Sequence, residues 1–122
     1  MTLRRISIPL VLAAVLGTAA LAHAGTSTSA GLVGEVGPGF TIEVSQHGRD
    51  VKKLRAGTYR IKVEDKSSIH NFHLRGPGVN KSTSVAFVGD TAWRVRLAPG
   101  TYTYQCDPHA AAGMKGTFRV TR

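Results

Sequence analysis

The chain has 122 residues, a formal net charge of +9 at pH 7 and a single cysteine, so it cannot form an internal disulfide. This length accommodates one domain, which can bury a single hydrophobic core without disulfides. The positive charge is typical of proteins steered toward acidic partners. Nucleic acid is not the expected partner, because the basic residues alternate with apolar ones instead of forming a phosphate-binding stripe, and because the first residues have the pattern of an export signal, described next.

The first segment is a predicted signal peptide. Arg4 and Arg5 precede a mostly apolar run over residues 6–22, and residues 22–24 (Ala-His-Ala) match the small-x-small pattern of a cleavage site. We expect the signal at residues 1–24, although the run approaches the length of an uncleaved membrane anchor. The arginine pair leaves both the twin-arginine and the general secretory route open. The mature protein is then periplasmic or secreted, without a membrane span.

A short Ser/Thr/Gly linker is predicted at residues 25–31 and one domain at residues 32–122. Apolar residues with period two predict strands in FTIEV, YRIKV, WRVRL, YTYQC and FRV, which begin at Phe40, Tyr59, Trp93, Tyr102 and Phe118. Each first residue is expected to face the core. Turn residues separate these segments and no long helix is indicated, so the fold is all-β, an antiparallel sandwich or small barrel of about seven to eight strands.

The Pro99-Gly100 pair is predicted to close a hairpin between the Trp93 strand and the strand that ends at Cys106. Cys106 shares strand parity with Tyr102, so its thiol should point inward. Asp107 and Pro108 then break the strand and place His109 and Met114 on a loop. A thiolate, an imidazole and a thioether gathered in this way suit copper, whereas zinc would require four strong ligands.

A trigonal copper site needs a second imidazole, and two histidines lie upstream. His70 has the parity of the apolar Phe72 and Leu74, whereas His73 should face the opposite way. We therefore predict His70 as the ligand and His73 as a surface residue. His47 lies in a polar turn, and His23 is lost with the signal.

The pair His70-Asn71, followed by CDPHAAAGMKG over residues 106–116, resembles the cupredoxins, and the Cys-x-x-His-x-x-x-x-Met spacing is similar to that of their plastocyanin-like members. The resemblance covers most of the mature chain. It implies a Greek-key β-sandwich with one type 1 copper, Cu(I)/Cu(II), held by His70, Cys106, His109 and, more weakly, Met114. It also implies that Asn71 supports the site through hydrogen bonds. Gln105 stands where such sequences place a tyrosine, so a tyrosine route for electrons is not carried over.

The expected function is one-electron transfer between redox protein partners, some with acidic docking surfaces, by a monomer that is not an enzyme. The apolar loop of Pro108 and residues 110–112 would surround His109 and form a docking patch. Copper oxidases need further histidines beside the cysteine, where this chain has Gln105 and Asp107. The alternatives are a periplasmic copper chaperone or buffer that delivers copper to an oxidase, and a metal-free binding module.

Overall fold

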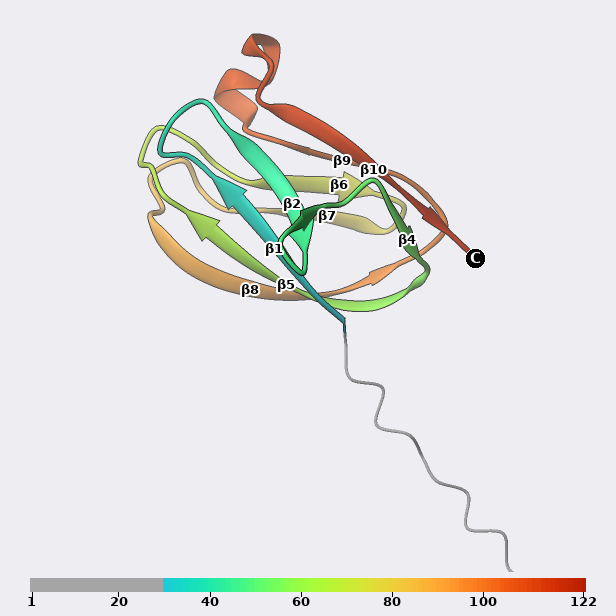
Figure 1. Cartoon of the computed structure of the whole chain (residues 1–122). Coiled ribbons are helices and arrows are strands. Elements are labelled where there is room, and N and C mark those ends of the chain that lie inside the picture. Colours follow the sequence, from blue (N-terminus) through green and yellow to red (C-terminus); the bar gives the residue numbers. More distant parts are fainter. Residues whose placement is uncertain (1–29) are drawn as a thin grey trace, which may run out of the picture.

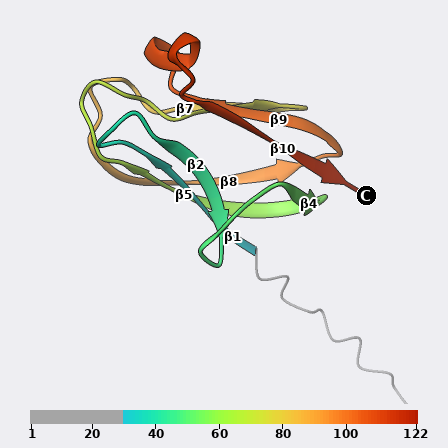
Figure 2. The ribbon, with the colours of Figure 1, turned by 45° about the horizontal axis from the view of Figure 1, so that its top comes forward.

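The computed structural model describes residues 30–122, and these residues form two five-stranded sheets that face each other (Figures 1 and 2). The proposed signal peptide and most of the proposed linker lie outside the described residues. One sheet, here the β5 sheet, has the order β3-β2-β1-β5-β8, and the other, the β9 sheet, has the order β4-β10-β9-β6-β7. The β5 sheet consists of β1 (Ala30–Val36), β2 (Ile42–Gln46), β3 (Arg49–Asp50), β5 (Gly57–Asp65) and β8 (Gly89–Leu97). The β9 sheet consists of β4 (Lys53–Arg55), β6 (His73–Gly76), β7 (Val79–Ser82), β9 (Gly100–Gln105) and β10 (Lys115–Thr121).

The core is built by alternate residues of both sheets, as expected for an aligned sandwich. Ile61 and Val63 of β5 are fully buried, and Tyr102 of β9 stacks on Phe118 of β10 with ring centroids 5.3 Å apart. The all-β prediction and the strand positions in β5, β8, β9 and β10 are confirmed. No helix among residues 30–122 has the length and apolarity needed to cross a bilayer.

The structure has ten strands, more than the seven to eight predicted, and the sheets are not purely antiparallel. β1 pairs with β5 in parallel, and β10 pairs with β4 in parallel. The additional strands β3, β4 and β7 have two to four residues, too few to show a period of two. β1 begins at Ala30, so residues 30 and 31 belong to a strand and not to a linker.

The predicted hairpin at Pro99-Gly100 is wrong. β8 pairs with β5 in one sheet, whereas β9 pairs with β10 and β6 in the other, so the turn carries the chain between sheets. Proline and glycine favour a tight turn both in a hairpin within one sheet and in a connection between two sheets. Only the pairing of the flanking strands distinguishes these two kinds of connection. The Tyr102 hydroxyl lies 2.9 Å from the Ala98 carbonyl oxygen, where it can donate a hydrogen bond that ties the turn to the core.

The prediction for Phe40 is also wrong. β2 begins only at Ile42, and the Phe40 side chain is 63% exposed in the loop before it. The alternation with Ile42 and Val44 therefore does not extend to Phe40, because Gly37, Pro38 and Gly39 keep the preceding chain out of the ladder.

Candidate metal centre

The loop between β9 and β10 lies at one end of the sandwich, where it contains the 3-10 helix η1 (Asp107–Ala112) (Figures 1 and 2). Cys106 directly follows β9, and Met114 directly precedes β10. The Cys106 amide donates to the Met114 carbonyl at 3.0 Å, and the Met114 amide donates to the His109 carbonyl at 3.2 Å. Gly113 adopts a left-handed conformation with φ 97° and ends η1. These bonds fix the backbone of Cys106, His109 and Met114 relative to one another.

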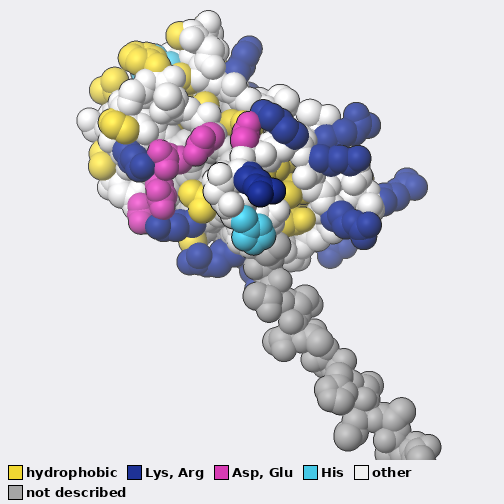
Figure 3. Space-filling view, viewed as in Figure 1, with side chains coloured by type: hydrophobic (Ala, Val, Ile, Leu, Met, Phe, Trp, Pro, Cys, Tyr) yellow, Lys and Arg dark blue, Asp and Glu magenta, His cyan; other side chains and the backbone are white. Residues whose placement is uncertain are grey.

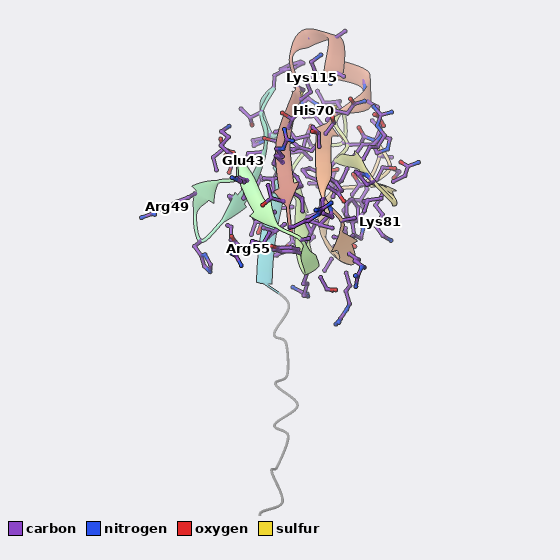
Figure 4. The ribbon with its side chains drawn as sticks, turned by 90° about the vertical axis from the view of Figure 1, so that its right-hand side faces the viewer. Glu43, Arg49, Arg55, His70, Lys81 and Lys115 are labelled. Atoms are coloured by element: carbon purple, nitrogen blue, oxygen red, sulfur yellow. The ribbon has the colours of Figure 1, made fainter. Side chains whose placement is uncertain are left out.

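His70 reaches the same end from the segment before β6. β6 is antiparallel to β9, with His73 opposite Gln105, so the residues before β6 meet those after β9. Phe72 and Leu74 are buried in the core, and His70 is buried with them. Figure 4 shows His70 and Lys115, the first residue of β10, toward the same end of the sandwich. The pairing explains why residues 36 positions apart, His70 and Cys106, become neighbours.

Three potential ligand atoms converge in this region. Cys106 Sγ lies 3.4 Å from His109 Nδ1 and 3.7 Å from His70 Nδ1, and the two Nδ1 atoms are 3.0 Å apart. Three electron-pair donors this close repel one another unless protons or a cation lie between them. A sulfur with two imidazole nitrogens, and with Met114 buried beside the loop, fits copper better than zinc.

The histidine rings differ in their surroundings. The His70 ring turns its Nδ1 toward the cluster. Its other nitrogen, Nε2, is buried and has no hydrogen-bond partner among residues 30–122. His109 is only partly buried. The Phe40 ring meets both imidazoles edge-on, with centroid distances of 5.2 Å to His70 and 4.8 Å to His109. Phe40 thus covers the cluster from the solvent side, a position that its apparent strand pattern did not reveal.

Asp107 links the two segments that carry the cluster. Asn71 Nδ2 donates to the Asp107 carboxylate at 2.9 Å, and the Asp107 amide donates to Asn71 Oδ1 at 2.7 Å. Gln105 Nε2 also donates to this carboxylate, at 2.8 Å. Burial raises the pKa of Asp107, but hydrogen bonds from Asn71, Gln105 and His73 outweigh it and lower the pKa to about 2. The loop is therefore tied to the His70 segment by a charged acceptor.

His73 points away from the cluster, as its parity predicts, but it is more than a surface residue. Its Nδ1 lies 2.9 Å from the Asp107 carboxylate and its Nε2 lies 2.6 Å from Asn80 Oδ1. The sequence analysis missed both Asp107 and His73 as parts of the site. The position of Asp107 directly after the cysteine was a signal that it could belong to the site. The role of His73 depends on the pairing of β6 with β9, which the sequence does not show. His47 lies exposed in the turn between β2 and β3, away from the cluster.

A second buried network fixes the chain just after His70. Thr83 Oγ1 accepts a hydrogen bond from the Phe72 amide at 2.9 Å and donates to Asp65 Oδ2 at 3.1 Å. The Asn71 side chain donates to the Thr83 carbonyl at 3.3 Å. Burial raises the pKa of Asp65, partly offset by hydrogen bonds from Ser67 and Thr83. The position of His70 is thus set by the β5 sheet as well as by the β9 sheet.

Comparisons with known proteins agree with this geometry. Residues 39–121 match the family described as copper binding proteins, plastocyanin/azurin family. The chain is 39% identical over 61 residues to chloroplastic plastocyanin of Physcomitrium patens, a match that covers 50% of this chain but only 29% of that relative.

Solved structures with this fold include reduced rusticyanin, which is 26% identical with a TM-score of 0.57, the match covering 75% of this chain and 78% of that one. A second structure, rusticyanin from Thiobacillus ferrooxidans, is 26% identical with a TM-score of 0.53 and covers 75% of this chain and 76% of its own. The predicted resemblance to the cupredoxins and the copper cofactor are confirmed. The chain belongs to the copper-binding proteins of the plastocyanin/azurin family.

Proposed function

We propose that the protein is a one-electron carrier that holds one type 1 copper through His70, Cys106 and His109, with Met114 as a weaker fourth ligand. The observation that carries the proposal is the convergence of Cys106 Sγ with the Nδ1 atoms of His70 and His109. A bound copper ion would supply a couple between Cu(I) and Cu(II), with no bond made or broken in a substrate.

The chain's own contribution is a ligand set that is held in place before the metal binds. Cys106 and Met114 are joined through their backbones, and Asp107 and Asn71 join the cysteine loop to the His70 segment. Ligands held in this way move little when the charge of the site changes. Small rearrangement is what a rapid electron carrier requires.

Electrons would enter and leave at the end of the sandwich where His109 lies. His109 is the least buried of the three converging residues, and apolar side chains surround this end. Two of these apolar side chains are Phe40, which is 63% exposed, and Ile69, which is 53% exposed. The others are three exposed residues of η1, Pro108, Ala111 and Ala112. Such a patch suits brief contact with a redox protein, because weak, transient complexes bury small areas.

The burial of Cys106 and His70 argues against the chaperone alternative, since a delivery protein needs ligands that a recipient can reach. Burial also protects the thiolate from oxidation in an oxidising compartment. We further propose export, because residues 1–24 have the composition of a signal peptide. Mass spectrometry of the protein purified from cell envelope and medium tests this: a chain beginning at Gly25 is expected, and an intact amino terminus would contradict it.

The decisive experiment is to add one equivalent of Cu(II) to the protein and to record visible absorption and electron paramagnetic resonance spectra. We expect an intense blue band and a small parallel hyperfine splitting, both lost in Cys106→Ser. His47→Ala is the control, because His47 is exposed in the turn between β2 and β3, away from the cluster, and it should keep the blue band. A colourless protein, or an ordinary square-planar spectrum that survives Cys106→Ser, would reject the proposed site.

A further inference from the structure

The two sheets differ sharply in charge. All seven acidic residues of the chain lie among the described residues: six are in strands of the β5 sheet, and the seventh is Asp107 in η1. The strands of the β9 sheet contain no carboxylate and carry six exposed basic residues, Lys53, Arg55, Arg75, Lys81, Lys115 and Arg119. Figure 3 shows the acidic side chains gathered in one region, with Lys and Arg crowded toward the side that bears the carboxyl terminus.

Ion pairs sharpen this difference. Four acidic residues of the β5 sheet pair with lysines: Glu35 with Lys66 at 2.9 Å, Asp50 with Lys52 at 2.6 Å, and both Glu64 and Asp90 with Lys62, at 2.7 and 3.2 Å. None of the six cations of the β9 sheet forms an ion pair with any residue from 30 to 122. Lys53 and Arg119 are direct register partners across β4 and β10, as Arg60 and Arg94 are on the β5 sheet. Like charges placed side by side destabilise a sheet, and no strand of the β9 sheet supplies a carboxylate to offset them.

We propose that the outer face of the β9 sheet is a docking surface for a redox protein whose own contact surface is rich in Asp and Glu. This inference rests on the proposed electron carrier. The outward residues between the cations are short threonines, Thr101, Thr103 and Thr117, so the cationic side chains project from a low, flat surface. Figure 4 labels two of the outward cations, Lys115 of β10 and Arg55 of β4. Lys81 lies opposite the buried Leu74 in edge strand β7, so it does not belong to the outer face.

The face adjoins the metal centre directly. Gln105 and Lys115 are register partners, and they are the chain neighbours of Cys106 and Met114 respectively. A partner bound to the face therefore lies over β9 and β10, the strands that lead to Cys106 and from Met114. It also lies close to the apolar end at His109. At roughly 3.3 Å per residue and 4.8 Å per strand, the face measures about 20 Å in each direction. That size fits the short-lived complexes in which charge sets the rate of association.

A binding experiment tests the surface without requiring electron transfer. The mature protein loaded with Cu(I) is titrated with poly-L-glutamate while backbone amide shifts are recorded by NMR, and the metal-free protein is titrated in parallel. We expect shifts confined to the β9 sheet, including Thr103, Thr117 and Arg119, that disappear at high salt. Shifts spread evenly over both sheets would overturn the proposal. Binding of phosphatidylserine vesicles by the same residues without binding of poly-L-glutamate would also overturn it, in favour of a membrane.

Charge reversal provides the matched comparison. Lys53→Glu with Arg119→Glu changes the net charge as much as Arg60→Glu with Arg94→Glu, which lie opposite each other on the β5 sheet. The first pair should weaken poly-L-glutamate binding by about tenfold or more, and the second by less than about threefold. Equal losses would show that only net charge matters and would reject the surface. Electron exchange of both variants with a neutral small reagent should stay unchanged. This second measurement tests the electron carrier by itself, so a failure of the docking surface can be told apart from a failure of the proposed function.

Discussion

Asn71 and Asp107 are joined by two hydrogen bonds, from Asn71 Nδ2 to the carboxylate at 2.9 Å and from the Asp107 amide to Asn71 Oδ1 at 2.7 Å. Together these bonds connect the chain on either side of the metal centre, at the residue after His70 and the residue after Cys106. Because Asn71 is buried, its amide has no water to replace a lost partner.

Asn71→Ala is therefore expected to lower the free energy of unfolding of the metal-free protein by about 1 to 3 kcal/mol, since it removes both hydrogen bonds to Asp107 and leaves the carbonyl of the buried Thr83 without its partner. Urea denaturation measures this change. Asn80→Ala removes only an exposed hydrogen bond to His73 and serves as the control, with an expected loss below about 1 kcal/mol. Similar losses in both variants would show that the link from Asn71 to Asp107 is not special.

The stability of the metal-free protein should depend on pH through Asp107. Its pKa in the folded protein is about 2, below the usual 3.8, so the carboxylate stabilises the fold above about pH 4 and this contribution is lost as the pH falls toward 2. The side chain is 43% exposed, and allowance for solvent screening leaves about 1 kcal/mol. Urea denaturation between pH 5 and 2 measures it. Asp107→Asn should lack this part of the pH dependence, and parallel curves for the two proteins would contradict the assignment.

Met114→Leu should leave a coloured copper site with a higher reduction potential. Leucine has a similar volume and fits the buried position, but it removes a fourth donor, and the more highly charged Cu(II) depends on that donor more than Cu(I) does. We expect a rise of the order of 60 mV, which is tenfold in a one-electron equilibrium. Voltammetry of both proteins provides the measurement. An unchanged potential would show that Met114 is not a ligand.

Gly34→Ala should destabilise the protein and disturb the metal centre. A Cβ atom at Gly34 would lie 2.5 Å from Phe72 Cζ, and the Phe72 ring is fully buried two residues after His70. Overpacking of this kind costs about 1 to 3 kcal/mol. Gly31→Ala is a control in the same strand, because no atom lies within 4 Å of its added Cβ. Thermal unfolding compares the two, and equal melting temperatures would show that the Phe72 ring yields without cost.

The amino-acid sequence determined the residue types that meet at the metal centre. The spacing of Cys106, His109 and Met114 places all three on one short loop, and the parity of His70 with Phe72 predicts an inward imidazole. The first prediction is local, because it depends only on the length of the loop. The prediction from parity reached the right residue outside the strand that it assumes, since His70, Asn71 and Phe72 precede β6 and all three are buried. The long alternating strands β5, β8, β9 and β10 were predictable because the period of a strand is a local property.

Sequence reasoning failed where a residue's surroundings depend on which strands pair. Phe40 continues an alternating pattern but lies outside the ladder, over His70 and His109. Pro99 and Gly100 have hairpin chemistry but connect different sheets. His73 has the parity of a solvent-facing residue, and only the antiparallel pairing of β6 with β9 brings it to Asp107.

Charge gives the clearest division between the two levels. The sequence alone determines an excess of basic residues, which alternate with apolar ones along many strands. This alternation predicts that the basic side chains face water on every strand. Strand pairing then sorts six of the seven carboxylates into one sheet and leaves the other with cations only. Alternation decides whether a side chain faces water, since it is a property of one strand, whereas the neighbours of that side chain belong to other strands and are decided by tertiary structure.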